Sequence, residues 1–342
     1  NERFELTNKL TAEADSVSTQ SELLRFVERA LMLLGDHHAI TGASFSNSWA
    51  VVPSYSDLWI EKHAGEFFVT HVRADSPASK AGVRPGDALT AIGDRQTQAA
   101  IDDFWADLGA PKGTLNDEFA VRVLAAGRRD QSRQLTFQRQ SEAPIELELM
   151  NLYQVETQQR PLLSITARED AVFIKINDSL WNNDLIAEFD AAMAQLEPEQ
   201  DIIIDLTNTP TGGNTVVARA IMGWFVEEAT AYQIHKLPAE FRRSGIKRQW
   251  AEYVLPREGK YHSGSVTLRV GRWTGSMGEG LALGFHAMGA QVEGSAMAGL
   301  LGAVYDEKLP NSGLIVKLPV ESLFSMSGAA REDFIPTVPV EF

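Results

Sequence analysis

The stretch over residues 74–94 constrains the fold of this 342-residue chain more than any other, because its turn residues leave few backbone paths. Ser76 and Pro77 are typical of the N-cap and first turn of a helix, and Gly82 is typical of its end. The Pro-Gly-Asp sequence that follows predicts a turn into a strand over 89–92. We therefore expect short strands joined by tight turns around one short helix.

The segments on either side of this stretch predict further elements of the same small domain. They comprise a strand over 67–72, a helix over 101–108, and strands over 118–124 and 134–138. The order of these pieces resembles a PDZ domain: an apolar strand is followed by S-P-A-x-x-A-G-V-x-P-G-D and then by I-G-D. The resemblance implies a PDZ-like β-domain over 51–140, which would bind extended peptide by strand addition at a sheet edge.

The balance of charges and the absence of cysteine exclude several classes of protein. Asp and Glu total 46 against 31 Lys and Arg, a net charge of −15, so neither nucleic acid nor an anionic lipid surface is an expected partner. Without cysteine, the chain has no disulfide, no thiolate nucleophile and no zinc–thiolate site. No apolar run reaches the roughly 18 residues that a membrane span needs, so we expect none.

The amino-terminal segment, residues 1–50, is expected to be helical. Apolar residues recur at helical spacing over 20–35, and Gly35 suits a C-cap. His37 and His38 follow directly after this helix. Either histidine is a candidate general base, because imidazole titrates near neutrality; a solvated pair or half of a metal site are the alternatives.

The second half of the chain has an alternating α/β pattern. Apolar runs predict strands over 171–176, 201–206 and 266–270. Helical spacing predicts helices over 183–196, 216–225 and 277–288. Alternation on this scale predicts a layered sheet flanked by helices.

Two loops that lead from a strand into a helix are candidate parts of a catalytic site. Ser276 stands at one junction, where the positive end of the helix would favour negative charge developing at its hydroxyl. Gly212 and Gly213 follow another buried strand, and their N–H groups can form an oxyanion hole. The alternatives are a helix N-cap for the serine and an ordinary turn for the glycines. No Gly-Lys-Ser/Thr follows the glycines, which argues against a phosphate loop.

A carboxylate near the carboxyl end is a further candidate. Glu332 and Asp333 stand side by side before a proline, and either could orient a catalytic base. A charge cluster on the surface is the alternative at this position.

Taken together, these pieces resemble the S41 peptidases, the family of C-terminal processing and tricorn-like serine proteases. Three motifs carry the resemblance: a glycine-rich loop over 205–215, a nucleophile segment over 274–280 and a closing segment over 332–340. In the first of them, Thr207 stands where the family commonly has Arg. The resemblance covers nearly the whole chain.

The family implies a multi-domain α/β architecture. We expect an N-terminal helical segment over 1–50, the PDZ-like domain over 51–140, and a layered, ClpP/crotonase-like catalytic core over 141–342. Within that core, residues 230–262 mix charged and aromatic side chains and are expected to form a cap or substrate wall.

The resemblance also implies roles for single residues. Ser276 is the expected nucleophile. Other members of the family pair it with a lysine, but 294–304 holds none, so the tricorn-like histidine is the better match. The family's D-x-H-T pattern after a helix selects His38 over His37 as the base, and Glu332 is then the group that orients it.

In this scheme the oxyanion would be held by N–H groups of Gly212 or Gly213 and of Met277. The expected activity is that of a serine endopeptidase acting on extended or C-terminal polypeptide segments, in the periplasm or outside the cell, without metal or cofactor. The alternative is a non-catalytic peptide- or lipophile-binding protein on a degenerate S41 scaffold. Substrate identity and oligomeric state stay open.

Overall fold

A computed structural model describes residues 2–110, 116–155, 161–168 and 170–340, and the chain divides into two compact units. Unit 1 comprises Asn1–Glu156 and Tyr305–Leu318, and unit 2 comprises Thr157–Val304 and Pro319–Phe342. The expected helical segment and PDZ-like domain fall in unit 1, together with a later piece of chain that no sequence pattern assigned there.

Unit 1 is built on an antiparallel sheet. Its strands are β2 (Leu58–His63), β3 (Glu66–Val72), β4 (Ala88–Ile92), β5 (Arg95–Gln96), β6 (Arg133–Gln138) and β7 (Ile145–Leu149). They pair in the order β2-β3-β4-β6-β7, with β5 on β4. Strand β2 therefore forms one edge of this sheet.

Helices cover the sheet of unit 1 and lead into it. They are α1 (Glu2–Ala14), α2 (Gln20–Met32), α3 (Pro77–Lys80), α4 (Thr97–Leu108) and α5 (Asp117–Ala126). The short helix α3 begins as its turn chemistry predicts, with the Ser76 side chain accepting the N–H of Ser79. Phe104 of α4 and Phe119 of α5 pack into the core beneath the sheet.

The later piece of unit 1 is part of a second, smaller sheet. Strand β17 (Ala303–Lys308) pairs with β18 (Ile315–Phe324), and the first part of β18 pairs antiparallel with β1 (Ile40–Thr41). Beside this pairing, Leu31, Ala39 and Val316 form a small buried apolar cluster. Residues from both pieces of the chain thus complete unit 1.

The strand predicted over 118–124 is wrong, because these residues form helix α5. The side chain of Asn116 caps the helix by accepting the N–H of Phe119 at 3.0 Å, and Gly127 ends it at a φ of 77°. Burial on more than one side of α5, which includes Val121 and Val123, outweighs the β-propensity of the valines.

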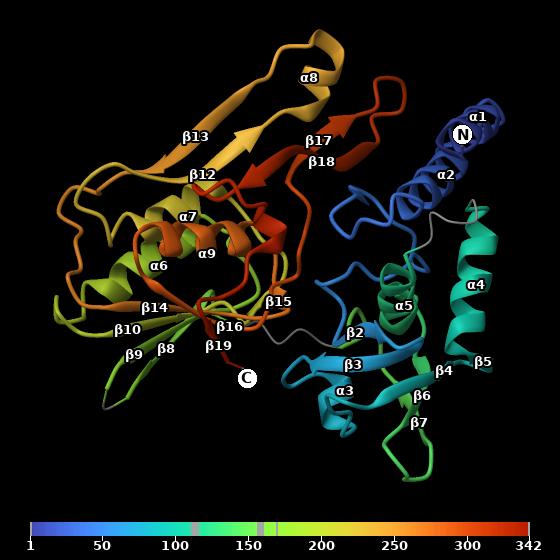
Figure 1. Cartoon of the computed structure of the whole chain (residues 1–342), viewed down its shortest axis with the longest axis horizontal. Helices are drawn as coiled ribbons and strands as arrows, with labels where there is room; N and C mark the ends of the chain where they lie inside the picture. The colour runs from blue at the N-terminus through green and yellow to red at the C-terminus, as the bar shows by residue number, and fades with distance from the viewer. Residues whose placement is uncertain (1, 111–115, 156–160, 169, 341–342) are drawn as a thin grey trace. The chain divides into compact units, whose positions relative to one another are not determined.

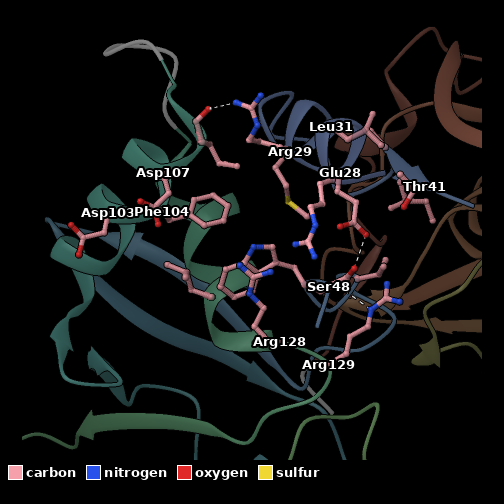
Figure 2. Close-up of a pocket in the computed structure, with 18 of the residues that line it drawn as sticks. Glu28, Arg29, Leu31, Thr41, Ser48, Asp103, Phe104, Asp107, Arg128 and Arg129 are labelled. Atoms are coloured by element: carbon pink, nitrogen blue, oxygen red, sulfur yellow. Dashed lines mark hydrogen bonds between the residues drawn. The ribbon is translucent and has the colours of Figure 1, made fainter. Parts of the chain in front are cut away.

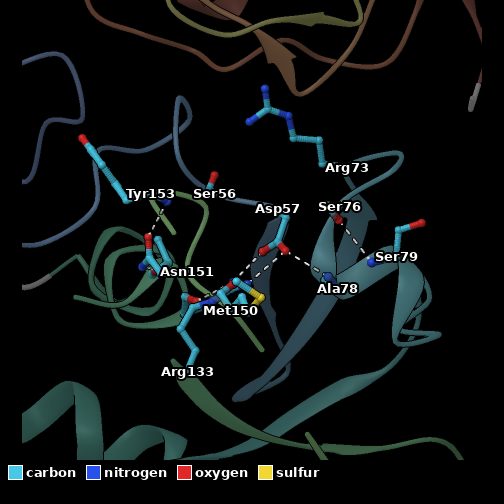
Figure 3. Close-up of polar contacts among 12 residues, drawn as sticks. Ser56, Asp57, Arg73, Ser76, Ala78, Ser79, Arg133, Met150, Asn151 and Tyr153 are labelled. Carbon is cyan, nitrogen blue, oxygen red and sulfur yellow. Dashed lines mark hydrogen bonds and ion pairs between the residues drawn. The ribbon is translucent and has the colours of Figure 1, made fainter. Parts of the chain in front are cut away.

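A buried ion pair joins Asp57, just before β2, to Arg133, the first residue of β6 (Figure 3). The carboxylate of Asp57 receives two bonds from the Arg133 guanidinium, at 2.5 and 3.1 Å, and accepts the N–H of Ala78 at 3.0 Å. Arg133 also donates to the carbonyl oxygens of Ala125 and Met150. Because both charged groups are almost fully buried, these partners together offset the cost of removing them from water.

Unit 2 is built on a mainly parallel sheet. Its strands are β8 (Leu163–Ala167), β9 (Val172–Ile176), β10 (Ile202–Asp205), β14 (Val266–Val270), β16 (Gln291–Gly294) and β19 (Val338–Pro339). The order is β19-β16-β14-β10-β9-β8, and only β8 runs antiparallel to its neighbour among these pairs. Strand β10 lies in the middle and carries the isoleucine run expected of a buried strand.

Three helices pack on one face of this sheet: α6 (Asp184–Met193), α7 (Thr215–Met222) and α9 (Met277–Ala287) (Figure 1). Their other side is covered by the strands β12 (Thr230–Lys236) and β13 (Gln249–Val254). Unit 2 therefore has the layered α/β arrangement that the sequence predicts.

The residues expected to form a cap, 230–262, fold largely as a hairpin, with the short helix α8 (Pro238–Ser244) between β12 and β13. The last part of β18 pairs with β12 on its other side. Whether this hairpin contacts substrate stays a prediction.

A buried charge cluster holds these three strands together. His235 of β12 contacts Glu321 of β18 at 2.6 Å and Glu252 of β13 at 3.1 Å, and Glu252 also pairs with Arg219 of α7. Burial by itself would lower the pKa of His235, but the bonds with the two glutamates outweigh it and raise the pKa to about 9. The imidazole is therefore a cation at neutral pH.

Unit 2 also contains two short strands and one 3₁₀ turn. Strand β11 (Asn208–Thr209) pairs with β15 (Trp273–Thr274), and η1 (Arg331–Asp333) lies near the end of the chain. Across the described ranges, no helix combines the length and the apolar character needed to cross a membrane.

Candidate active site

Ser276 lies between β15 and α9 in a backbone conformation that few residues other than glycine adopt. Its φ is 51° and its ψ is −110°. Such a conformation persists only where the surrounding structure enforces it, and it is found preferentially at functional sites. The side chain is half-buried at the amino end of α9, where the helix favours negative charge.

The segment before Ser276 is held by its neighbours. The buried hydroxyl of Thr274 donates to the carbonyl oxygen of Leu206 at 2.8 Å and accepts the N–H of Gly271 at 2.9 Å. Gly275 donates its N–H to the carbonyl oxygen of Thr209 at 3.1 Å. These bonds dock the serine segment against the loop that follows β10.

The loop after β10 approaches Ser276 so closely that only glycine fits. A Cβ atom added to Gly212 would lie 2.4 Å from the Cβ and 2.9 Å from the Oγ of Ser276. A Cβ added to Gly213 would lie 2.2 Å from the carbonyl carbon of Leu180. Both glycines also have positive φ, at 63° and 153°. The two separate sequence motifs therefore meet at one place.

The same loop presents backbone donors beside the serine. Leu180 donates to the carbonyl oxygen of Gly212 at 2.7 Å, and Asn214 donates to the carbonyl oxygen of Leu180 at 3.1 Å, which fixes the loop. Among the described residues, no acceptor takes the N–H of Gly213 or of Met277. An oxyanion hole needs such fixed, unoccupied donors.

Glu279 is a residue of this site that sequence reasoning missed. Its carboxylate is fully buried and accepts N–H groups from Ser276 at 2.7 Å, Gly299 at 2.9 Å and Leu300 at 3.2 Å. Burial raises the pKa of Glu279 to about 7, although nearby Arg331 and the three N–H groups partly lower it. The Ser-x-x-Glu spacing is that of a capping box, and this spacing is the sequence signal from which a role for Glu279 could have been predicted.

The carboxyl-terminal candidates differ in their surroundings. Arg331 is buried and donates to the carbonyl oxygens of Leu300 and Gly302, at 2.7 and 2.9 Å. Glu332, the next residue, has a buried Oε2 atom with no hydrogen-bond partner among the described residues. Asp333 is exposed. Of the two carboxylates, only Glu332 has a buried oxygen atom without a hydrogen-bond partner among the described residues, and a buried polar atom normally has one.

The two histidines lie in unit 1, just after α2. His37 stacks on Phe119 with ring centroids 4.5 Å apart. Burial, with a smaller contribution from Arg122, lowers the pKa of His37 to about 3, so this ring stays neutral. The N–H of His38 donates to the Asp36 carboxylate at 2.8 Å. Because Ser276 belongs to unit 2, its pairing with His38 stays a prediction.

Known proteins share both the PDZ domain and the overall fold of this chain. The model of the PDZ domain family matches residues 68–104. The structure of a photosystem II D1 C-terminal processing protease is 14% identical, with 95% of this chain and 83% of that chain covered and a TM-score of 0.56. The chain has the fold of a C-terminal processing protease with a PDZ domain.

Structures of mature CPAF agree with this fold. Mature CPAF is 14% identical over 94% of this chain and 82% of its own, with a TM-score of 0.54. The structure of mature CPAF complexed with lactacystin is 15% identical in sequence and covers 94% of this chain and 83% of its own, with a TM-score of 0.53. No curated protein sequence matches. The predicted resemblance to S41 peptidases and the multi-domain α/β fold are thereby confirmed.

The PDZ domain of this S41-type fold has an occupied sheet edge. Glu118 of α5 accepts the N–H of Lys62 at 3.1 Å, and the Nε of Arg122 donates to the carbonyl oxygen of Ile60 at 3.0 Å. These are backbone groups on the outer side of β2, which an added peptide strand would need. Strand addition at β2 would therefore have to displace side chains of α5.

In the described part of the chain, no group of three His, Asp or Glu side chains is arranged to hold a metal ion. At Ser276 itself the structure places the serine hydroxyl, the backbone N–H donor of Met277 and that of Gly213 in the neighbouring loop, and the Glu279 carboxylate. Those groups are the ones that acyl transfer uses.

Proposed function

We propose that this protein is a serine endopeptidase in which Ser276 attacks the carbonyl carbon of a peptide bond. The observation that carries the proposal is the meeting of a strained serine with Gly212, where an added Cβ would lie 2.9 Å from the serine Oγ. The next residue, Gly213, approaches the backbone of Leu180 just as closely. A serine that only capped a helix would need neither the positive φ nor the empty N–H groups of Gly213 and Met277.

The proposed mechanism assigns one role to each group. The hydroxyl of Ser276 adds to the carbonyl while His38 takes its proton, and the N–H groups of Gly213 and Met277 bind the oxyanion. Each such donor contributes about 3 kcal/mol of transition-state stabilisation. His38 then protonates the leaving amine, and water releases the acyl group. Glu332 would orient the imidazole with its unpaired Oε2 atom.

The proposed substrate is an extended polypeptide segment, including segments near a carboxyl terminus. The shared fold with a C-terminal processing protease supports this class of substrate. The peptide is not proposed to enter by strand addition to β2, because α5 occupies that edge.

A fluorophosphonate probe tests the proposal, because it reacts with activated serine hydroxyls and requires no knowledge of the substrate. We expect the protein to be labelled and the Ser276→Ala variant to remain unlabelled. Ser21→Ala, which changes an exposed serine of α2, serves as the matched control and should label fully. Lactacystin, present in one CPAF structure, offers a second probe whose adduct should map to Ser276.

The rival function is a binding protein on the same scaffold. The S41 resemblance implies Arg at the position of Thr207, whose N–H and hydroxyl instead both donate to Asp205, at 2.8 and 2.6 Å. If correctly folded protein resists the probe and cleaves no denatured protein substrate, the peptidase proposal is wrong and the binder is favoured.

A further inference from the structure

A pocket in unit 1 has no role in the proposed chemistry. Its volume is about 620 Å³, within the range of small-molecule sites. Figure 2 shows its walls: α4 contributes Asp103, Phe104 and Asp107, while α2 contributes Glu28, Arg29 and Leu31. The pocket lies wholly within one compact unit, so its shape does not depend on the other unit.

Much of the lining is apolar. The side chains concerned come from both helices, from the segment before β2 and from α5: Leu31, Met32, Trp49, Phe104, Leu108 and Leu124. An apolar group placed among them would leave water, which stabilises binding by about 25 cal/mol per Å² of buried surface. This lining favours an apolar chain rather than a polar ligand.

The charges at the pocket are not balanced. Five arginines and three acidic residues line it. Arg29 pairs with Glu13 and Arg95 pairs with Asp103, but Arg25, Arg128 and Arg129 make no ion pair with any described residue. The charges of Glu28, Asp107 and Asp130 attract Arg128 without forming an ion pair with it, so arginines still outnumber the acidic residues that line the pocket.

These arginines are held in place by other contacts. The Arg128 guanidinium lies 3.9 Å from the centroid of the Trp49 ring and donates to the carbonyl oxygen of Asn47 at 3.0 Å. Arg129 donates to the carbonyl oxygen of Trp49. Glu28 of α2 accepts a bond from Ser48 at 2.6 Å (Figure 2). Preorganised guanidinium groups beside an apolar wall suit a carboxylate.

We propose that this pocket binds an apolar chain that ends in a carboxylate, with the chain against Phe104 and Leu124 and the carboxylate at Arg128. A fatty acid and a polypeptide carboxyl terminus share this chemistry. Because α5 closes the edge of β2, this site, rather than strand addition, gives the PDZ-containing unit a ligand. The proposal does not depend on the peptidase activity.

Titration calorimetry of the full chain tests the pocket with four probes: laurate, dodecanol, a peptide ending in Leu-Val-Val with a free carboxylate, and the same peptide amidated. We expect either laurate or the free-acid peptide to bind, and the one that binds shows whether the natural ligand is a fatty acid or a polypeptide carboxyl terminus. The matching uncharged probe, dodecanol or the amidated peptide, should bind roughly tenfold more weakly. Equal binding of charged and uncharged probes would overturn the assignment of the head group. No binding of any probe would overturn the site.

Variants locate the binding within unit 1. Arg128→Gln should weaken the charged probe roughly tenfold and leave its uncharged counterpart unchanged. Leu124→Trp should block both probes by filling the pocket, and Arg84→Gln, an exposed arginine outside the pocket, is the matched control. Unfolding midpoints identify any variant that fails to fold. Unchanged binding in folded Arg128→Gln would place the ligand elsewhere and refute the proposal.

Discussion

The strained backbone of Ser276 is maintained from both sides along the chain. Thr274 anchors the residues before it to the loop after β10, and Glu279 holds the N–H of Ser276 from the first turn of α9. Glu279 also binds the N–H groups of Gly299 and Leu300, so one carboxylate fixes the serine relative to a second loop. Positive φ at a non-glycine residue costs of order 1–3 kcal/mol, which these bonds offset.

The substitution Glu279→Gln tests this role. A glutamine oxygen can still accept the N–H groups of Gly299 and Leu300, but its amide NH₂ would then face the N–H of Ser276. We expect fluorophosphonate labelling to slow by roughly tenfold or more and the free energy of unfolding to fall by about 1–3 kcal/mol. Labelling rates and urea denaturation measure the two effects. Unchanged labelling would mean that Glu279 only stabilises the fold.

Replacing the histidines separates the proposed base from its neighbour. His38→Ala should reduce kcat/KM for peptide cleavage by roughly a thousandfold or more, since the proton acceptor is lost. His37→Phe should retain most of the activity, because His37 is buried, neutral and stacked on Phe119. Steady-state cleavage of a fluorogenic peptide measures both. A larger loss in His37→Phe than in His38→Ala would reverse the assignment.

For single residues, the sequence predicts the serine and glycines of the candidate site better than it predicts the side chains that hold them in place. The paired glycines and Ser276 each lie in a motif with a recognisable turn, and the structure brings both motifs together. Glu279 reads as a helix cap, and its bonds to Gly299 and Leu300 depend on a loop twenty residues away. The unpaired oxygen of Glu332 likewise has no signature in the sequence.

Among the elements, helix α5 shows where local patterns mislead. Its sequence contains closely spaced valines that favour a strand, but the Asn116 cap and burial against β2 and α4 make it a helix. By contrast, α3, α9 and β10 fold where their caps and apolar runs predict. The sequence of α5 holds both a cap at Asn116 and valines that favour a strand, so its local signals conflict and its contacts with β2 and α4 decide the outcome.

Hydrogen exchange can show that α5 protects the edge of β2. In Glu118→Ala, the amide of Lys62 loses its acceptor, so we expect its exchange to accelerate by roughly tenfold or more. Asp117→Ala is the matched control, because Asp117 pairs with the Lys62 side chain and not with its backbone. Equal exchange of the Lys62 amide in both variants would indicate that the helix does not seal the edge.

For the molecule as a whole, the charge cluster at His235 predicts how stability depends on pH. The pKa of His235 is about 9 in the folded chain against 6.5 for the free group, so the folded state binds this proton more tightly. The resulting stabilisation is complete below about pH 6.5 and is lost as the pH rises to about 9.

We therefore expect the free energy of unfolding of unit 2 to fall by about 2 to 3 kcal/mol between pH 6.5 and 9. Urea denaturation followed at several pH values measures this fall. His235→Gln should be less stable at pH 6.5 but should show a much smaller decline towards pH 9. A decline as steep as that of the unmodified protein would mean that another group titrates.

The composition of unit 1 has a consequence for how the protein is made. Its small cluster of Leu31 and Ala39 is completed by Val316, and β1 gains its partner only from β18. During synthesis, unit 1 can finish folding only after residues 305–318 have left the ribosome. A fragment that ends at residue 156 would lack the partners of β1, Leu31 and Ala39, so isolating unit 1 requires joining residues 305–318 to it.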